Sequence, residues 1–171
     1  MQGQTVRYGT NGICRVEGIE KKVFGGQTME YYVLKPVAQE SATLYVPAGN
    51  AKLVSRMQRL LTAQEIHEVI SSMDEENSLW IAEDVKRRET YTEILHTGDR
   101  KAMAGVIKTL FLRRQELALK RKKLHAADEK LLKEAERVLY EEFAYVLGIS
   151  QDKVAEYILD KLGTQEKEVN G

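Results

Sequence analysis

The chain has 171 residues, of which 43% are hydrophobic, and its 26 basic and 26 acidic side chains give a formal net charge of zero at pH 7. This length allows one or two domains with real cores, and the composition excludes a disordered chain. No apolar run reaches the ~20 residues of a membrane-spanning helix, and the N-terminus lacks a signal-peptide pattern, so we expect a cytoplasmic protein without membrane association. The single cysteine, Cys14, excludes an internal disulfide and a cysteine-based metal site made by one chain.

The charges are distributed unevenly along the chain. Residues 84–123 carry 12 basic and 5 acidic side chains, a balance of +7. The neighbouring segments are acidic. Residues 56–83 carry 2 basic and 6 acidic side chains, and residues 124–171 carry 6 basic and 11 acidic side chains. A neutral protein with this distribution can hold a local positive field.

Residues 1–55 predict a small β-domain. Runs rich in β-branched and aromatic residues at 6–8, 13–19, 29–34 and 42–46 are separated by turn residues, among them Gly25-Gly26. We expect roughly five short strands that form a strongly bent sheet or a small barrel. Pro47 ends the last run, and we place the connection to the next domain near residues 48–61.

From Thr62 onward the apolar spacing predicts helices. Thr62 and Glu65 form a capping box at the start of the first helix. Gly98 is predicted to end one helix, and Asp99 is predicted to cap the start of the next. The further helices are predicted from Asn77 or Ser78 to about Leu95, from about Arg100 to Lys123, from the break at 125–128 to Leu147, and around 154–162. The fold class is therefore α+β, with a β-barrel domain over residues 1–55, an all-helical domain of about five helices over residues 62–163, and a flexible tail over residues 164–171.

The sequence offers no convincing catalytic or cofactor site. His67, His96 and His125 are dispersed without the spacing of a ligand set, and Gly25-Gly26 lacks the context of a nucleotide-binding loop. The acidic pairs at 75–76 and 141–142 fall on polar helix faces and are interpreted as solvated surface. We expect a protein that is not an enzyme, with no catalytic residues, no metal site and no cofactor.

Trp80, the only tryptophan, precedes the basic run Lys86, Arg87 and Arg88. If the two long helices around Gly98 pack antiparallel, Trp80 comes close to the second basic cluster, which includes Arg113 and Arg114 and continues through 120–123. An aromatic wedge beside cations suits contact with a nucleic acid. The competing interpretations are that Trp80 is a core residue and that the basic run is a solvated helix face.

The chain resembles the CarD/CdnL family of bacterial transcription regulators over nearly its whole length. The N-terminal half is similar in Val6-Arg-Tyr-Gly-Thr-Asn-Gly12, Ile19 through Gly26, Glu30-Tyr-Tyr-Val-Leu34 and Tyr45-Val-Pro-Ala-Gly-Asn50. The helical half is similar in Trp80 to Arg88, Leu95-His-Thr-Gly-Asp99, Val106 to Glu116 and Asp128 to Glu142. The order and spacing of these segments through both domains carry the resemblance.

The resemblance implies a Tudor-like, SH3-like N-terminal barrel that docks on the β subunit of RNA polymerase, a module shared with the transcription-repair coupling factor. Lys22 and Tyr45 fall where family members contact the polymerase, although Tyr45 replaces what is often a basic residue. The resemblance also implies a helical domain whose tryptophan, here Trp80, wedges into the minor groove of promoter DNA at the upstream edge of the melted region, without sequence specificity. The candidate contacts to the DNA backbone are Lys86, Arg87, Arg88, Arg113 and Arg114.

Two functions from different classes follow from the sequence. The first is a non-catalytic regulator that binds RNA polymerase and stabilises the open promoter complex through Trp80. The alternative is a protein-interaction adaptor, in which the β-domain binds polymerase or another partner and the helices are a scaffold without DNA contact. We expect a monomer, with a dimer as the alternative.

Overall fold

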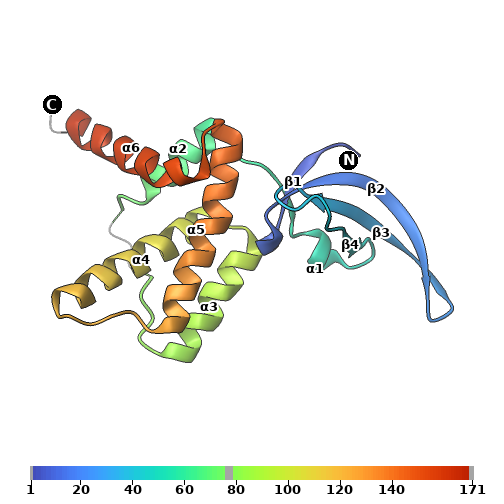
Figure 1. The fold of residues 1–171 in the computed structure, drawn as a ribbon, viewed down its shortest axis with the longest axis horizontal. Coiled ribbons are helices and arrows are strands. Elements are labelled where there is room, and N and C mark those ends of the chain that lie inside the picture. The colour runs from blue at the N-terminus through green and yellow to red at the C-terminus, as the bar shows by residue number, and fades with distance from the viewer. Residues whose placement is uncertain (1, 76–78, 170–171) are drawn as a thin grey trace. The chain divides into compact units, whose positions relative to one another are not determined.

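The computed structural model describes residues 2–75 and 79–169, with side chains up to residue 163 (Figure 1). The chain divides into two compact units, Met1–Leu60 and Leu61–Gly171. The first is an antiparallel sheet and the second is helical, so the α+β fold class predicted from the sequence is confirmed.

Five antiparallel strands form the sheet of the first unit. They are β1 (Thr5–Tyr8), β2 (Ile13–Phe24), β3 (Gln27–Pro36), β4 (Leu44–Pro47) and β5 (Met57–Arg59), in the order β4-β3-β2-β1-β5. A single turn of 3-10 helix, Gly9–Asn11, joins β1 to β2. The expectation of five strands is confirmed, and β2 and β3 extend beyond the predicted runs into a long curved hairpin (Figure 1).

The hairpin turn is set by Gly25 and Gly26. Phe24 pairs with Gln27 across the turn, and the two glycines have φ angles of 57° and 80°. Positive φ at both central residues is the requirement of a tight hairpin turn whose twist matches that of the strands. The predicted hairpin at Gly25-Gly26 is therefore confirmed.

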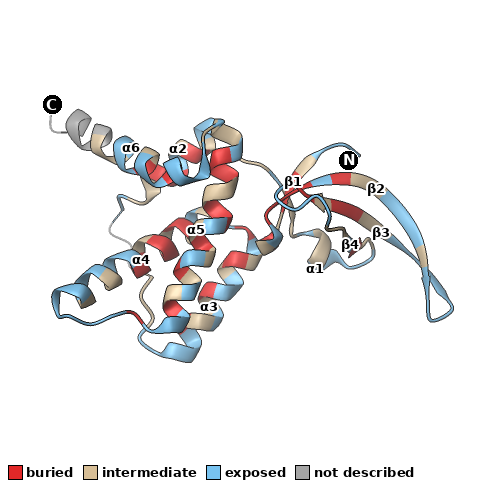
Figure 2. Ribbon diagram, in the orientation of Figure 1, coloured by how far each residue is buried: buried red, intermediate tan, exposed pale blue. Residues whose placement is uncertain are grey.

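The core of this unit lies at the base of the hairpin. It consists of Val6, Cys14, Val16, Leu34 and Val46. Figure 2 shows that the buried positions of β2 and β3 lie near the base of the hairpin, whereas its tip is exposed. Cys14 is fully buried, as expected for a small core residue.

The connecting segment expected at residues 48–61 contains structure that the sequence did not reveal. A short helix, α1 (Ala51–Val54), begins with Asn50 as its cap, and β5 pairs with β1 to complete the sheet. Both elements are short, and β5 has only three residues, too few for a hydrophobic period to be recognised.

Among its described residues, the second unit has five α-helices and one short 3-10 turn. They are α2 (Ala63–Ser72), α3 (Asp84–Thr97), α4 (Arg100–Leu119), α5 (Ala126–Leu147), the 3-10 turn Gln151–Lys153 and α6 (Val154–Val169). Thr62 and Glu65 form the predicted capping box. Gly98 ends α3 with φ 83°, and the Asp99 carboxylate accepts from the Ala102 N–H at 3.0 Å, so the predicted stop and cap are confirmed.

Three predicted helix boundaries are wrong. α3 begins at Asp84, so Trp80 lies before the helix; the expected start at Asn77 or Ser78 is outside the described residues. α4 ends at Leu119 and not at Lys123, and Arg121 takes a left-handed conformation with φ 57°. α6 continues to Val169, beyond the predicted end before Gly163 and into the segment expected as a flexible tail.

The helical core is formed by the inward faces of all five α-helices, and Figure 2 shows its buried positions on α3, α4 and α5 facing one another. Glu142 is fully buried within it, so the prediction of solvated surface is wrong for this residue. The Glu142 carboxylate accepts from Arg100 Nε at 2.9 Å and from the Leu61 backbone N–H at 2.9 Å. Burial is tolerated because these donors compensate the charge.

Candidate functional site

Trp80 lies in the irregular segment Leu79–Glu83, immediately before α3. Its side chain is half-buried and packs against the edge of the helical core. The structure therefore matches neither of the two sequence interpretations in full, because the indole is partly a core residue and partly accessible.

The backbone of this segment is held at both ends by side chains from the helices. The Leu79 carbonyl accepts from the Tyr91 hydroxyl at 2.6 Å, and the Leu79 N–H donates to the Thr109 hydroxyl at 3.3 Å. Burial raises the pKa of Tyr91 to about 12, so its hydroxyl stays protonated and remains a donor at neutral pH. A segment without helical hydrogen bonds is thus fixed in one position beside α3 and α4.

The Arg87 side chain holds the other end of the Leu79–Glu83 segment. Its Nη1 donates to the Ile81 carbonyl at 2.9 Å, and its Nε and Nη2 donate to the two carboxylate oxygens of Asp128 at 3.2 and 2.7 Å. Nη2 also donates to Asp84 at 2.8 Å. Arg87 and Asp128 are 1% and 2% exposed, so this two-point ion pair is buried in the domain.

The pKa shifts follow from this geometry. The hydrogen bond to Asp128 is the largest cause of the raised pKa of Arg87, while burial acts in the opposite direction. The hydrogen bond from Arg87 is likewise the main reason that the pKa of Asp84 is lowered. Arg87 is therefore a permanent internal cation, and the expectation that it reaches a phosphate does not fit its burial.

Two guanidinium groups stack on the Trp80 ring. The Cζ atoms of Arg87 and Arg113 lie 4.4 and 4.9 Å from the ring centre, within the range of cation–π attraction. Arg87 is buried, whereas Arg113 is partly exposed and pairs with Glu116 at 3.2 Å. The antiparallel return of α4 thus brings Trp80 to Arg113, as the sequence indicated.

The other predicted cations lie at the surface around this centre. Lys86 is exposed, Arg88 is about one-third exposed with Nε 3.8 Å from Asp128, and Arg114 pairs with Glu129 at 3.0 Å. The basic residues at 120–123 are exposed after the end of α4. The structure therefore leaves Lys86, Arg88, Arg113 and Arg114 accessible and removes only Arg87 from the surface.

Sequence reasoning missed the residues that support Trp80. Asp128, Tyr91 and Thr109 come from three helices, and Asp128 and Thr109 are distant from Trp80 in the sequence. Gly105 on α4 allows Leu79 to approach the helix closely, because a Cβ there would lie 2.7 Å from Leu79 Cδ1. The only available signal was Gly105 itself, a glycine inside a helical pattern, which suggests a close approach.

In the β unit, Lys22 and Tyr45 are brought together. Lys22 Nζ lies 3.7 Å from the centre of the Tyr45 ring. Tyr31 makes edge-to-face contacts with Tyr45 and Phe24, with ring centres 6.4 and 6.0 Å apart. We call Lys22, Phe24, Tyr31 and Tyr45 the aromatic face.

The strand register explains why these four residues share one side of the sheet. Tyr45 pairs with Val33, which stands two residues after Tyr31 on β3, and alternation places both on the same side. The core residues Tyr32 and Leu34 point to the other side. Phe24 is 60% and Tyr45 43% exposed, so the aromatic face is an accessible aromatic surface with a cation over the Tyr45 ring.

The described residues contain no group of three or more His, Cys, Asp or Glu side chains that could hold a metal ion. Within the same part of the chain, no helix is both long and apolar enough to cross a membrane.

Comparison with known families assigns both units. The model of the CarD-like/TRCF RID domain matches residues 1–60, and the model of the CarD C-terminal domain matches residues 65–159. Together the two matches cover the aromatic face and the surroundings of Trp80.

Proposed function

The chain belongs to the CarD family and is an RNA-polymerase-interacting transcription regulator, and on that premise we propose that it stabilises the open promoter complex through a DNA contact made by Trp80. In this proposal the Tudor-like β unit docks on the β subunit of the polymerase. Trp80 then meets the minor groove at the upstream edge of the melted region.

The observation that carries the proposal is the setting of Trp80. A half-buried indole is fixed by polar anchors on Leu79 and Ile81 and lies against two guanidinium groups. A simple core tryptophan needs neither an anchored irregular segment nor a partly exposed cation on its ring. An inserting side chain benefits from both, because a fixed wedge loses little conformational entropy on binding and the cation attracts phosphates.

The basic residues divide into two roles. Lys86, Arg88, Arg113 and Arg114 are accessible and are proposed as contacts to the DNA backbone. Arg87 is withdrawn from that set, and we assign to it the positioning of Trp80. Neutral net charge fits this arrangement, since polymerase docking supplies a high effective concentration and weak DNA contacts then suffice.

The proposed mechanism requires no chemical step and no sequence readout. A wedge that binds the distorted, partly melted duplex more tightly than the closed duplex shifts the equilibrium towards the open complex. A differential affinity of ~1–3 kcal/mol changes the open population by about five- to a hundredfold. We therefore propose a regulator without catalytic activity, and we propose that a single chain is the active form.

The aromatic face is the proposed polymerase contact. It combines large exposed rings, the composition found at the centre of protein interfaces, with one lysine whose charge is already oriented by Tyr45. Phe24 and Tyr31 join Lys22 and Tyr45 in this role.

The test measures open-complex half-life and polymerase capture with the variants Trp80→Ala and Trp80→Phe. We expect Trp80→Ala to shorten the half-life by about fivefold or more, Trp80→Phe to have an intermediate effect, and both to be captured normally. Val85→Ala, at a nearby position that is 63% exposed, is the control and should leave both readouts unchanged.

Urea unfolding of each variant shows whether a shorter half-life comes from the loss of the DNA contact or from unfolding of the helical unit. If Trp80→Ala is unstable, Trp80→Phe provides the test. A folded Trp80→Ala variant with normal capture and an unchanged half-life would exclude the DNA contact. The helices would then be a scaffold and the protein an adaptor.

A further inference from the structure

An apolar groove of about 470 Å³ lies in the helical unit between α2, α4, α5 and α6. Ile107 and Ile158 form its floor and are each 4% exposed. Phe111, Leu112 and Leu159 stand along its sides and are 40%, 45% and 69% exposed. This volume is within the range of pockets that bury a ligand or several side chains.

Two apolar stripes, one on α4 and one on α6, line the groove. Ile107 and Phe111 are one turn apart on α4, and Ile158 and Leu162 are one turn apart on α6. Each stripe begins in the core and continues to the surface. Isolated exposed leucines are common on proteins, but a continuous apolar surface from two facing helices is typical of a binding site.

Four charged residues line the groove, and its two cations are already engaged. Lys108 Nζ donates to the Glu75 carbonyl at 2.7 Å, and Arg114 pairs with Glu129 at 3.0 Å. The two acidic residues of the lining, in contrast, lack such partners among the described side chains. Within residues 2–75 and 79–163, the Asp74 and Glu136 side chains have no hydrogen bond or ion pair. Lys108 keeps its charge because its acceptor is a neutral carbonyl, whereas Glu136 is a partly buried carboxylate that no side chain of these residues pairs with.

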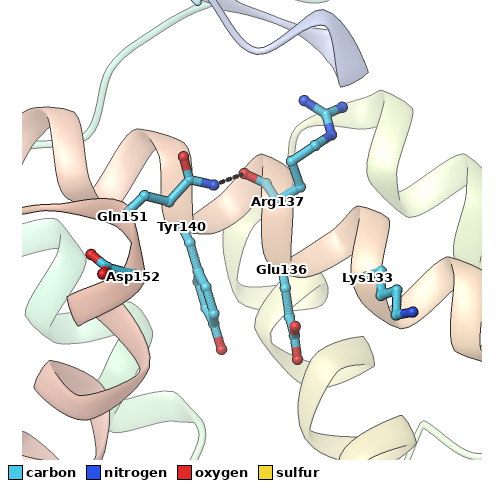
Figure 3. Close-up of a pocket in the computed structure, with 6 residues that line it drawn as sticks. All are labelled: Lys133, Glu136, Arg137, Tyr140, Gln151 and Asp152. Carbon is cyan, nitrogen blue, oxygen red and sulfur yellow. Dashed lines mark hydrogen bonds between the residues drawn. The ribbon is translucent and has the colours of Figure 1, made fainter.

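Glu136 and Tyr140 line the groove from α5. Figure 3 draws another pocket that both residues also line, and it shows their side chains extending side by side while Arg137 extends in the opposite direction. Burial raises the pKa of Glu136 despite the nearby Arg114, and it raises the pKa of Tyr140 to about 12. A half-buried carboxylate next to a protonated hydroxyl is a site that a cationic partner group would stabilise.

We propose that this groove binds an amphipathic helix of another protein, with apolar side chains seated between α4 and α6 and a lysine or arginine paired with Glu136. Charge complementarity selects this occupant. An anionic ligand would be repelled by Glu136 and Asp74 and would find one cation in the described lining, Lys108, since Arg114 is paired with Glu129. Nucleic acid, whose phosphates need several cations, is disfavoured for the same reason. The inference concerns a protein contact and does not depend on the DNA contact of Trp80.

The test uses an array of helical peptides of about 15 residues, with leucines at i, i+3 or i+4 and i+7 in several registers. Every register is made in a lysine series and a glutamate series. Fluorescence anisotropy measures their affinity for the full chain. We expect at least one register of the lysine series to bind with micromolar affinity. Its glutamate counterpart should have an affinity lower by about fivefold or more.

Two variants with matched controls locate the binding. Glu136→Gln should weaken the lysine peptide about fivefold and should not weaken its glutamate counterpart, and Leu159→Ser should weaken both. Glu93→Gln and Leu119→Ser are the controls, because Glu93 is exposed on α3 and Leu119, 88% exposed, lies on α4 outside the groove. Both control variants should bind like the unchanged chain.

Three results would overturn the proposal. One is the absence of binding by every register of the lysine series. Another is equal binding of the two series, which would indicate apolar adhesion without charge recognition. The third is self-association of the chain that Leu159→Ser abolishes in sedimentation experiments, which would make the groove an interface between two copies.

Discussion

Arg87 and Asp128 are 41 positions apart in the sequence and form a two-point ion pair in which both side chains are almost completely buried. The same guanidinium stacks on Trp80 and donates to the backbone at Ile81. One buried pair thus joins α3 and α5 and also sets the position of the indole. The stability of the helical unit and the placement of Trp80 are therefore coupled.

Removing the charge of Asp128 tests this coupling. In Asp128→Asn the guanidinium loses its buried carboxylate and keeps only Asp84, which is half exposed, so we expect the free energy of unfolding to fall by about 3–5 kcal/mol. Urea unfolding measures the loss. Glu129→Gln is the matched control at the next position, because Glu129 pairs with Arg114 at the surface and should contribute less than about 1 kcal/mol. Equal losses in the two variants would contradict a special role for Asp128.

The buried hydroxyl of Tyr91 predicts a loss of stability at alkaline pH. Its pKa is raised to about 12 in the folded chain from the usual 10, so the unfolded chain releases this proton first. The stabilisation is complete below pH ~10 and is lost as the pH rises towards 12, by roughly 2 kcal/mol for this group.

Tyr91→Phe isolates that contribution. The variant loses the hydrogen bond to Leu79 at all pH values, but its stability should decline less steeply than that of the unchanged chain between pH 9 and 11.5. Denaturant midpoints at a series of pH values provide the comparison, and parallel curves for the two proteins would refute the prediction.

Gly105 permits the close approach of Leu79 to α4, so Gly105→Ala should displace the Trp80 segment. The new Cβ would meet Leu79 Cδ1 at 2.7 Å, and this flexible side-chain end can move. We expect stability to change by less than about 1 kcal/mol, since alanine also favours the helix. Because Trp80 is the only tryptophan, a shift of its emission maximum and of its acrylamide quenching reports the displacement directly.

The control for that experiment is Gly163→Ala on α6, where an added Cβ meets nothing within 4 Å. It makes the same change in helix propensity and should leave the Trp80 emission unchanged. An unaltered emission in Gly105→Ala as well would show that Leu79 does not transmit the contact to Trp80.

Charge reversal at Lys22 tests the aromatic face. Lys22→Glu places a carboxylate over the Tyr45 ring, so we expect polymerase capture to weaken about tenfold or more. Lys21→Glu is the matched control, because Lys21 is adjacent to Lys22 on β2 and strand alternation places its side chain on the opposite face of the hairpin. Capture measured by surface plasmon resonance should distinguish the two variants, and equal affinities would remove the aromatic face from the interface.

The features predictable from sequence were those encoded locally. Gly25-Gly26, the capping box at Thr62 and the stop at Gly98 each act within a few residues, and each was correctly predicted. The start of α3 was not, because Trp80 and its neighbours are compatible with a helix by composition. Hydrogen bonds from Tyr91 and Arg87 hold this segment outside the helix. They are supported by distant residues, because Thr109 accepts from the Leu79 N–H and Asp128 holds Arg87 in place.

The candidate site was predictable only in part for the same reason. Trp80 and the accessible cations stand out by residue type, but Arg87 does not differ from Arg88 in the sequence. The distinction comes from Asp128, which occupies a buried position on α5. Glu142 was misjudged in the same way, since its partner Arg100 lies on another helix.

The central claim is that Trp80 contacts DNA at the upstream edge of the melted region. The most direct measurement places 2-aminopurine, a base analogue whose emission responds to stacking, at that edge in an open complex. We predict that the unchanged chain alters the 2-aminopurine emission and that folded, polymerase-bound Trp80→Ala does not. Identical emission with the two proteins at every upstream position would contradict the account.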